Sequence, residues 1–452
     1  MILPAVFVQS FEMTKNSSVV LYKLPYIAFT IITLTLRSCF YLSDLGIRPI
    51  TRLEEPRKRR IGAFGGIEYV QYDGIFSGRT STGKFRVPYR IAAPVNPEKG
   101  NQTVLVEPPH FNIALGARVF YLGEEFLFSR GFSHAGVGWS TTSFDGRNRR
   151  ILDPTVPGVF INGGFIEENG RVDDEIISEF AKALKIDRIA RRILGDIERR
   201  SITGFSDSSD PVLRLITSGL AEGVFDFALP FTAFGHDPQA AISAGLYDGK
   251  IIVVNSEFEG ASSEFVDRGI ALNQYRFYAV AGSPHIPDHL VFASLTTTNR
   301  TTPASFSPEL RAHFLQGDKW VRKGKQPPVS HHLLAAADGT LIEDDNGNAI
   351  SVNASGERVP RLPFVELGEA HYIGDFIGTY ESVKTIQQLG FDTHNDYLKA
   401  FREKLADYLD ARNILKEEAE EMFRRATLCP PTTYTETYRD HYDNFVDIIP
   451  CP

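Results

Sequence analysis

One stretch of the sequence constrains the fold more than any other. A predicted strand at residues 200–206 leads through a sharp turn into a predicted helix at 211–219. Gly204, Ser206 and Ser208 lie on the turn, where small residues are needed because the strand and the helix approach each other closely. The pattern is that of a nucleophile elbow, G-x-S-x-G, with serine in place of the last glycine. We interpret Ser206 as a nucleophile whose developing charge the helix N-terminus would stabilise, with a purely structural turn as the alternative.

Predicted strands and helices alternate along most of the chain. Segments with strand character lie at 66–78, 84–95, 103–107, 135–139, 225–234, 250–254 and 274–281. Segments with helical spacing lie at 114–129, 173–199 (one helix or two) and 394–426. Because strands separated by helices form parallel sheets covered on both faces, we expect an α/β fold with a mostly parallel central sheet flanked by helices. We also expect a hairpin at 66–95, loop insertions at 141–162 and 338–363, and a C-terminal helical extension.

The N-terminal region has an uncharged apolar run at residues 24–36, with Lys15 and Lys23 before it and Arg37 after it. The run is too short for a comfortable membrane span and fits the core of a signal peptide. We therefore expect residues 1–45 to be a signal-peptide-like or anchor segment with a linker, and residues 46–452 to be one elaborated domain. The predicted location is secreted or membrane-anchored, with membrane association through the apolar run; a cytoplasmic protein is the alternative.

Composition excludes some classes of partner and cofactor. The net charge is −8, with 48 basic and 56 acidic residues, which argues against a nucleic-acid-binding surface. The three cysteines, Cys39, Cys429 and Cys451, match no metal-ligand spacing and form no C-x-x-C pair. The sequence thus predicts neither a metal nor an organic cofactor. A disulfide between Cys429 and Cys451 remains open for a secreted protein.

A serine nucleophile needs a base and an acid that orients the base. The predicted strand at 250–254 is followed by Glu257 and Glu259, and the next strand is followed by His285. Because the carboxyl ends of parallel strands meet at one edge of the sheet, these side chains are placed to reach Ser206. In an extended segment the two glutamates point the same way, so either can be the acid. We favour Glu257 narrowly.

Two other histidines are alternative candidates for the base. His289 lies four residues further into the loop after His285, and His236 precedes the candidate acids in the chain. Since the expected chain order is serine, acid, histidine, His236 fits poorly and His285 is preferred.

Backbone N–H groups are expected to form an oxyanion hole. One belongs to Asp207, directly after the nucleophile, and the other is expected after the strand at 103–107, near His110 or Phe111. The acidic side chain of Asp207 would oppose an oxyanion unless it points away or pairs with a cation such as Arg214.

These residues resemble the large α/β-hydrolase-domain proteins of bacteria and fungi, whose elbow reads Gly-Phe-Ser-Gln-Ser-Gly. The likeness covers most of residues 48–427. It is carried by the elbow and by the segments Val224-Phe225-Asp226, Ser256-Glu257-Phe258-Glu259, Ala281-Gly282-Ser283-Pro284-His285, residues 320–328 (Trp-Val-Arg-Lys-Gly-Lys-Gln-Pro-Pro) and Arg361-Leu362-Pro363. This chain departs from the family at Asp207, where glutamine is usual, and at Ser209, where glycine is usual.

The resemblance implies the α/β-hydrolase fold and an esterase with a serine–acid–histidine triad. It carries over to Ser206, to Glu257 or Glu259, and to His285. We therefore expect hydrolysis of a carboxylic ester or lactone of a hydrophobic small molecule through an acyl-enzyme. An acyltransferase on the same triad and a non-catalytic binding protein of the same fold are the alternatives.

Overall fold

The computed structural model describes residues 51–81, 83–109, 121–139, 173–260, 264–286 and 302–428, and the backbone of four short strands. Residues Thr51–Pro452 form one compact unit, which is the one described below. The predicted leader at 1–45, with its apolar run at 24–36, lies outside the described residues, so the boundary near residue 46 stays a prediction. In the described ranges, none of the helices combines the length and apolar character that a membrane crossing requires.

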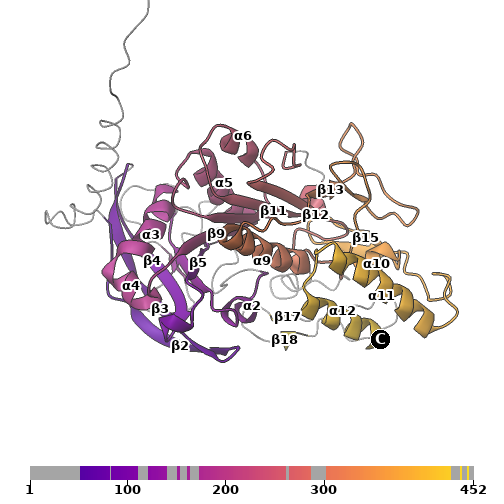
Figure 1. Ribbon diagram of the computed structural model, residues 1–452, viewed down its shortest axis with the longest axis horizontal. Helices are drawn as coiled ribbons and strands as arrows, with labels where there is room; N and C mark the ends of the chain where they lie inside the picture. The colour runs from indigo at the N-terminus through magenta and orange to yellow at the C-terminus, as the bar shows by residue number, and fades with distance from the viewer. Residues whose placement is uncertain are drawn as a thin grey trace, which may run out of the picture. The chain divides into compact units, whose positions relative to one another are not determined.

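A twelve-stranded mixed sheet forms the centre of this unit (Figure 1). Its spatial order is β1-β3-β4-β6-β5-β9-β10-β11-β12-β13-β14, and β2 pairs with β3. From β6 to β13 neighbouring strands are parallel, and both ends of the sheet are antiparallel. The strands are β1 (Arg52–Leu53), β2 (Arg57–Phe64), β3 (Ile67–Thr80), β4 (Gly83–Pro94), β5 (Thr103–Val106), β6 (Ser133–Val137), β9 (Arg199–Phe205), β10 (Phe227–Phe231), β11 (Lys250–Ser256), β12 (Tyr275–Val280), β13 (His331–Leu333) and β14 (Ser351–Asn353).

Helices cover the two faces of the parallel strands. The α-helices are α2 (Glu124–Phe128), α3 (Glu175–Ile186), α4 (Arg188–Leu194), α5 (Ser209–Thr217), α6 (Pro238–Ser243), α7 (Glu257–Gly260), α9 (Ser307–Lys323), α10 (Pro363–Glu366), α11 (His394–Asp410) and α12 (Lys416–Leu428). Short 3₁₀ turns are η1 (Pro97–Lys99) and η2 (Ser206–Ser208). In Figure 1, α5 and α6 lie on one side of the central strands and α9 lies on the other. The α/β fold with a mostly parallel sheet flanked by helices is confirmed.

Strand β11 shows why the sheet is covered on both faces. Its successive side chains alternate between two apolar cores. Ile251 and Val253 pack in the core that contains α3, α4 and α5, whereas Ile252 and Val254 pack in the core that contains α9, α11 and α12. Because both faces are buried, residues 251–254 of the strand form an apolar run without alternation.

Several predicted elements are refined by the structure. The hairpin at 66–95 is confirmed as β3 and β4. The helical segment at 173–199 is two helices, since Asp187 ends α3 and caps α4. The segment at 394–426 is likewise divided: Arg412 has a positive φ of 65° between α11 and α12. Of the helix expected at 114–129, the described part contains α2 alone, and residues 110–120 lie outside it.

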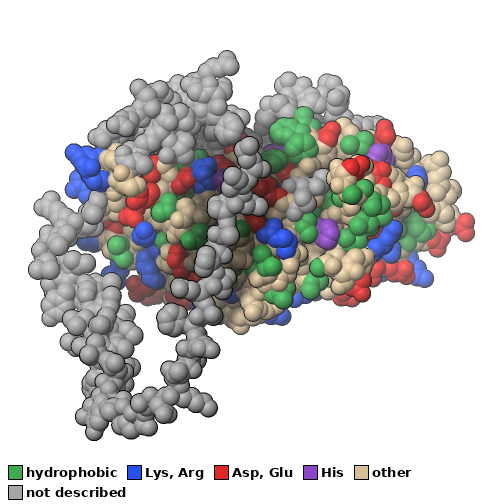
Figure 2. Space-filling model, turned by 90° about the horizontal axis from the view of Figure 1, so that it is seen from above, with side chains coloured by type: hydrophobic (Ala, Val, Ile, Leu, Met, Phe, Trp, Pro, Cys, Tyr) green, Lys and Arg blue, Asp and Glu red, His purple; other side chains and the backbone are tan. Residues whose placement is uncertain are grey.

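The turn-rich insertion at 338–363 contains short hairpin bridges, as predicted. Three two-stranded pairs stand apart from the central sheet: β7 (Arg150–Leu152) with β8 (Phe160–Asn162), β15 (His371–Ile373) with β16 (Thr379–Glu381), and β17 (Tyr438–Arg439) with β18 (Phe445–Val446). On the face shown in Figure 2, acidic and basic side chains are interspersed among the described residues.

Candidate active site

Ser206 lies on a sharp turn between β9 and α5. Its φ is +51°, a left-handed conformation that costs a non-glycine residue about 1–3 kcal/mol. A Cβ added at Gly204 would collide with the backbone carbonyl of Ser208, so a side chain at position 204 is excluded by the turn itself. The strand, the strained serine and the following helix together form the nucleophile elbow that the sequence predicts.

Ser208 stands where the elbow pattern has its last glycine. Its φ is −82°, so the backbone there does not require glycine. The Ser208 hydroxyl accepts a hydrogen bond from the Phe205 N–H (2.8 Å) and donates one to the Phe205 carbonyl (2.9 Å). These two hydrogen bonds join the Ser208 side chain to the backbone of Phe205 and stabilise the turn.

A hydrogen-bonded chain links three side chains at the carboxyl ends of neighbouring strands. Ser206 Oγ lies 2.8 Å from His285 Nε2, and Nδ1 of the same imidazole contacts Glu259 Oε1. Ser206 follows β9, Glu259 follows β11 within α7, and His285 follows β12. All three are buried, with exposed fractions of 8%, 2% and 3% for serine, glutamate and histidine. The structure thus brings Ser206, His285 and Glu259 into the order of a catalytic triad.

Glu259 is itself held in place. Its Oε2 accepts a hydrogen bond of 2.5 Å from the hydroxyl of Ser256, the last residue of β11. The Ser256 N–H also points to this oxygen, at 3.3 Å. One carboxylate oxygen is therefore fixed by β11, and the other is left for the imidazole.

The narrow preference for Glu257 as the acid is corrected by this geometry. It assumed an extended segment, in which the two glutamates would share a direction, but residues Glu257–Gly260 form a helical turn that sends them apart. The Glu257 carboxylate instead accepts hydrogen bonds from the N–H groups of Gly282 (2.7 Å) and Gly374 (3.0 Å). The pKa of Glu257 is raised overall, because the effect of burial exceeds the lowering by these two hydrogen bonds.

Ser206 has a neighbour that sequence reasoning missed. Thr232, just after β10, is fully buried and has a φ of +44°. Its hydroxyl accepts a hydrogen bond of 3.1 Å from the Ser206 N–H and donates one of 2.8 Å to the Phe231 carbonyl. The end of β10 therefore fixes the backbone at Ser206, through a contact that depends on the parallel pairing of β9 and β10.

The N–H of Asp207 is the first expected oxyanion donor, an assignment that stays a prediction, and the Asp207 side chain is partly buried. The pKa of Asp207 is raised overall, because the effect of burial exceeds the lowering by the charge of His285. Arg214, weighed as its cationic partner, forms ion pairs with Asp174 at 2.7 Å and with Asp210.

The second expected arm of the oxyanion hole, His110 or Phe111, lies outside the described residues. Strand β5 does pair directly with β9, in parallel, so the chain leaves β5 at the sheet edge where Ser206 lies. Glu107, the residue after β5, is buried and contacts His134 Nε2 at 2.8 Å. The assignment of His110 and Phe111 stays a prediction.

Of the other two candidate bases, His236 contacts a different acid from the one at His285. His236 Nε2 lies 3.3 Å from Asp210, and its side chain is 43% exposed. His289 lies outside the described residues, as do Cys39, Cys429 and Cys451. In the ranges that the structure describes, no cluster of histidine, cysteine or acidic side chains has the arrangement of a metal site.

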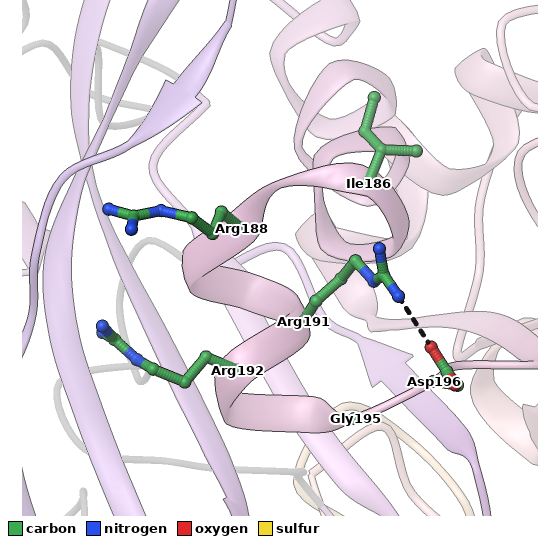
Figure 3. A pocket seen from close by; sticks show the side chains of 6 residues that line it. All are labelled: Ile186, Arg188, Arg191, Arg192, Gly195 and Asp196. Carbon is green, nitrogen blue, oxygen red and sulfur yellow. Dashed lines mark hydrogen bonds and ion pairs between the residues drawn. The ribbon is translucent and has the colours of Figure 1, made fainter. Parts of the chain in front are cut away.

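A hollow of about 470 Å³ lies elsewhere, on α4 (Figure 3). It is basic, but Arg191 points to Asp196 at 3.3 Å and Arg192 pairs with Glu55. None of the triad residues lines it. Paired, exposed arginines on an open surface indicate a solvated helix face, so we do not place the site here.

Comparison with known proteins identifies the fold. The profile of the family described as "Alpha/beta hydrolase domain" matches residues 77–424. No curated protein sequence matches the chain.

Similar solved structures are esterases with low sequence identity. They include an S-formylglutathione hydrolase from Agrobacterium tumefaciens (11% identity, TM-score 0.32, 50% of this chain and 91% of that one). A rice cell wall degrading esterase, LipA, from Xanthomonas oryzae has 13% identity and a TM-score of 0.26, over 40% of this chain and 50% of that one. A glucuronoyl esterase from Solibacter usitatus has 13% identity and a TM-score of 0.27, over 47% of this chain and 69% of that one. The likeness thus spans about half the length of LipA.

Proposed function

Because the chain belongs to the α/β-hydrolase domain family, we propose that it is a serine hydrolase that cleaves a carboxylic ester or lactone of a hydrophobic small molecule. One observation carries the proposal: the unbroken contact chain from Ser206 through His285 to Glu259, buried at the edge of a parallel sheet. A serine on a strained turn, with a base at 2.8 Å and an acid behind that base, is the arrangement that activates a hydroxyl nucleophile.

The first half of the reaction forms an ester with the enzyme. Ser206 Oγ attacks the substrate carbonyl carbon while His285 Nε2 takes its proton. The carbonyl oxygen becomes an oxyanion, which the Asp207 N–H and the start of α5 would stabilise. Glu259 keeps the Nδ1 proton of His285 in place and balances the charge of the imidazolium. The imidazolium then gives its proton to the leaving alcohol oxygen, and the acyl group remains on Ser206.

The second half of the reaction repeats the proton transfers with water. His285 takes a proton from a water molecule, whose oxygen attacks the acyl carbon of the acyl-enzyme. The tetrahedral species collapses when His285 returns the proton to Ser206 Oγ, which releases the carboxylic acid. An acyltransferase would use the same side chains and admit a second alcohol in place of water, so analysis of products formed with added alcohols separates these two activities.

Labelling with a fluorophosphonate tests the proposal. The probe phosphonylates a serine hydroxyl only when a base activates it. We expect Ser206 of the wild-type protein to be labelled, and the Ser206→Ala variant to remain unlabelled. Ser209→Ala is the matched control because Ser209 is also buried and adjacent to the elbow, but its hydroxyl has no hydrogen-bond partner among the described residues. Labelling that persists in Ser206→Ala, or none in folded wild-type protein, contradicts the proposal.

Asp207 favours a second candidate, a binding protein of this fold without catalysis. A carboxylate beside the oxyanion donor would weaken charge stabilisation in the transition state. Such a protein would bind an ester ligand, show no turnover and leave the probe unreacted.

A further inference from the structure

The exposed phenylalanine rings of the described residues all gather around His285. They are Phe234, Phe258 and Phe376, with exposed fractions of 48%, 43% and 46%. They come from three separate parts of the chain: the segment after β10, the helical turn α7, and the loop between β15 and β16. We call these three rings the phenylalanine collar. Large apolar side chains left in solvent at one point of the surface indicate a binding site.

The rings of the collar pack around the imidazole of His285. Phe376 stacks on the His285 imidazole, with ring centres 4.8 Å apart and planes 14° apart. Phe234 lies 5.7 Å from the imidazole at 33°. The Phe258 ring is edge-to-face with both, its plane at 73° to that of Phe376 and at 84° to that of Phe234. Because the three rings have different tilts around one point, a planar group that packs on the collar can make both stacked and edge-to-face contacts.

Hydrogen bonds hold Phe376 over the histidine. The Phe376 carbonyl accepts from the Ile286 N–H at 2.9 Å, and the Asp375 carbonyl accepts from the His285 N–H at 3.2 Å. Glu257 ties the same two loops together through Gly282 and Gly374. The collar is therefore built into the site, because the loop that carries Phe376 is bonded to the loop that carries His285.

The position of the collar determines which end of the substrate it meets. In the proposed mechanism, His285 Nε2 returns its proton to the leaving oxygen, so that oxygen must lie within hydrogen-bond distance of Nε2. Groups that pack around the imidazole then contact the alcohol part of the ester. Aromatic pairs in stacked or edge-to-face geometry are more stable than their buried area alone would make them.

We propose that the collar binds a planar aromatic ring in the alcohol part of the substrate, so that the preferred substrates are esters of arylmethyl alcohols. This inference rests on the proposed ester hydrolysis at Ser206. It assigns Phe234, Phe258 and Phe376 as the residues that determine specificity.

A matched pair of esters tests the inference. Benzyl acetate and cyclohexylmethyl acetate have the same carbon skeleton, and only the first has a flat ring. We expect kcat/KM to be about 3- to 10-fold higher for benzyl acetate, the range of one aromatic pair. In Phe258→Leu and Phe376→Leu, which keep an apolar side chain, the ratio should fall toward one while cyclohexylmethyl acetate is still hydrolysed. Phe423→Leu on α12 is the control and should leave the ratio unchanged.

The outcomes separate failure of this inference from failure of the proposed function. Equal kcat/KM values for the two acetates, or an unchanged ratio in both collar variants, overturn the inference. If fluorophosphonate still labels Ser206 in that case, the proposed serine hydrolase is retained. Labelling without hydrolysis of either acetate also overturns the inference. A ring preference found between methyl phenylacetate and methyl cyclohexylacetate, and absent from the acetate pair, contradicts the alcohol-side assignment. Loss of labelling as well as hydrolysis overturns both proposals.

Discussion

Glu259 and His285 meet at the ends of two adjacent parallel strands, with Glu259 Oε1 on Nδ1 of the imidazole and both side chains buried. The contact is directional because Ser256 holds the other carboxylate oxygen at 2.5 Å. Nε2 of the imidazole is left to face Ser206. An acid fixed in this way sets which nitrogen of the histidine carries the proton before substrate arrives.

Replacing the two glutamates separately distinguishes their roles. We expect Glu259→Gln to lower kcat for p-nitrophenyl acetate by roughly 10³- to 10⁴-fold, because the amide no longer favours the tautomer that serves as a base. Glu257→Gln keeps only one of the two acceptor oxygens that serve Gly282 and Gly374, but position 257 is outside the Ser206–His285–Glu259 contact chain, so kcat should fall by less than about 10-fold. A larger loss in Glu257→Gln than in Glu259→Gln would contradict the assignment.

Asp207 is expected to slow the reaction in a pH-dependent manner. Burial raises the pKa of Asp207, so its charge is lost at a higher pH than for an exposed aspartate. Above that pKa the carboxylate opposes the oxyanion, and below it the neutral carboxyl does not. We expect Asp207→Gln to raise kcat roughly 3- to 10-fold at pH 8, with the variant-to-wild-type ratio approaching one at acidic pH. A ratio that does not change with pH would show that the charge of Asp207 does not reach the oxyanion.

Gly204 tests the close packing of the elbow. Any side chain at this position meets the Ser208 carbonyl, so Gly204→Ala should destabilise the fold by more than about 3 kcal/mol, measured by urea unfolding. Gly245→Ala is the control: its φ is +71° and nothing lies within 4 Å of the added Cβ. That variant should lose about 1 kcal/mol, from backbone strain alone. Similar losses in the two variants would mean that the elbow can relax.

A buried acidic group away from the triad should make folding sensitive to acid. Glu309, on α9, contacts His331 at 3.3 Å and His313 at 3.5 Å, all within the core. Burial raises the pKa of Glu309, but the charge of His331 and its contacts with both histidines outweigh that effect and lower the pKa to about 2. Because the folded-state value lies below the ordinary 4.5, this stabilisation is complete above pH 4.5 and is lost as the pH falls toward 2.

Urea unfolding of Glu309→Gln across pH measures this effect. The variant should be about 3 kcal/mol less stable than wild type at neutral pH, since it leaves buried partners without their charge. The difference should shrink between pH 4.5 and pH 2. Glu420→Gln, which breaks an exposed pair with Lys416, should differ from wild type by less than about 1 kcal/mol at every pH. A stability difference for Glu309→Gln that is constant with pH would rule out the titration of Glu309.

The sequence predicted the parts of the molecule that local patterns determine. Apolar runs without alternation indicated strands buried on both faces, as β10 and β11 are, and the chain order placed Ser206, the glutamates and His285 at one sheet edge. The small residues of the turn indicated the elbow, which the collision at Gly204 explains.

The remaining parts depend on local geometry or on distant packing that a pattern does not encode. The choice between Glu257 and Glu259 depends on a single helical turn after β11. Four residues are too few to show a helical pattern of apolar residues in the sequence. Thr232 had no signal, because its role comes from the register between β9 and β10. Phe376 lies in the C-terminal part of the chain, and only the hydrogen bonds between its loop and the His285 loop bring it to the site.

Acyl-enzyme trapping tests the central claim most directly. Wild-type protein is mixed with p-nitrophenyl acetate, quenched in acid within the first turnover and mapped by peptide mass spectrometry. We predict one acetyl group on the peptide that contains Ser206, and none on that peptide in His285→Ala. Release of p-nitrophenol by wild-type protein with no acetyl group on Ser206, or acetylation that is equally fast in His285→Ala, would contradict the account.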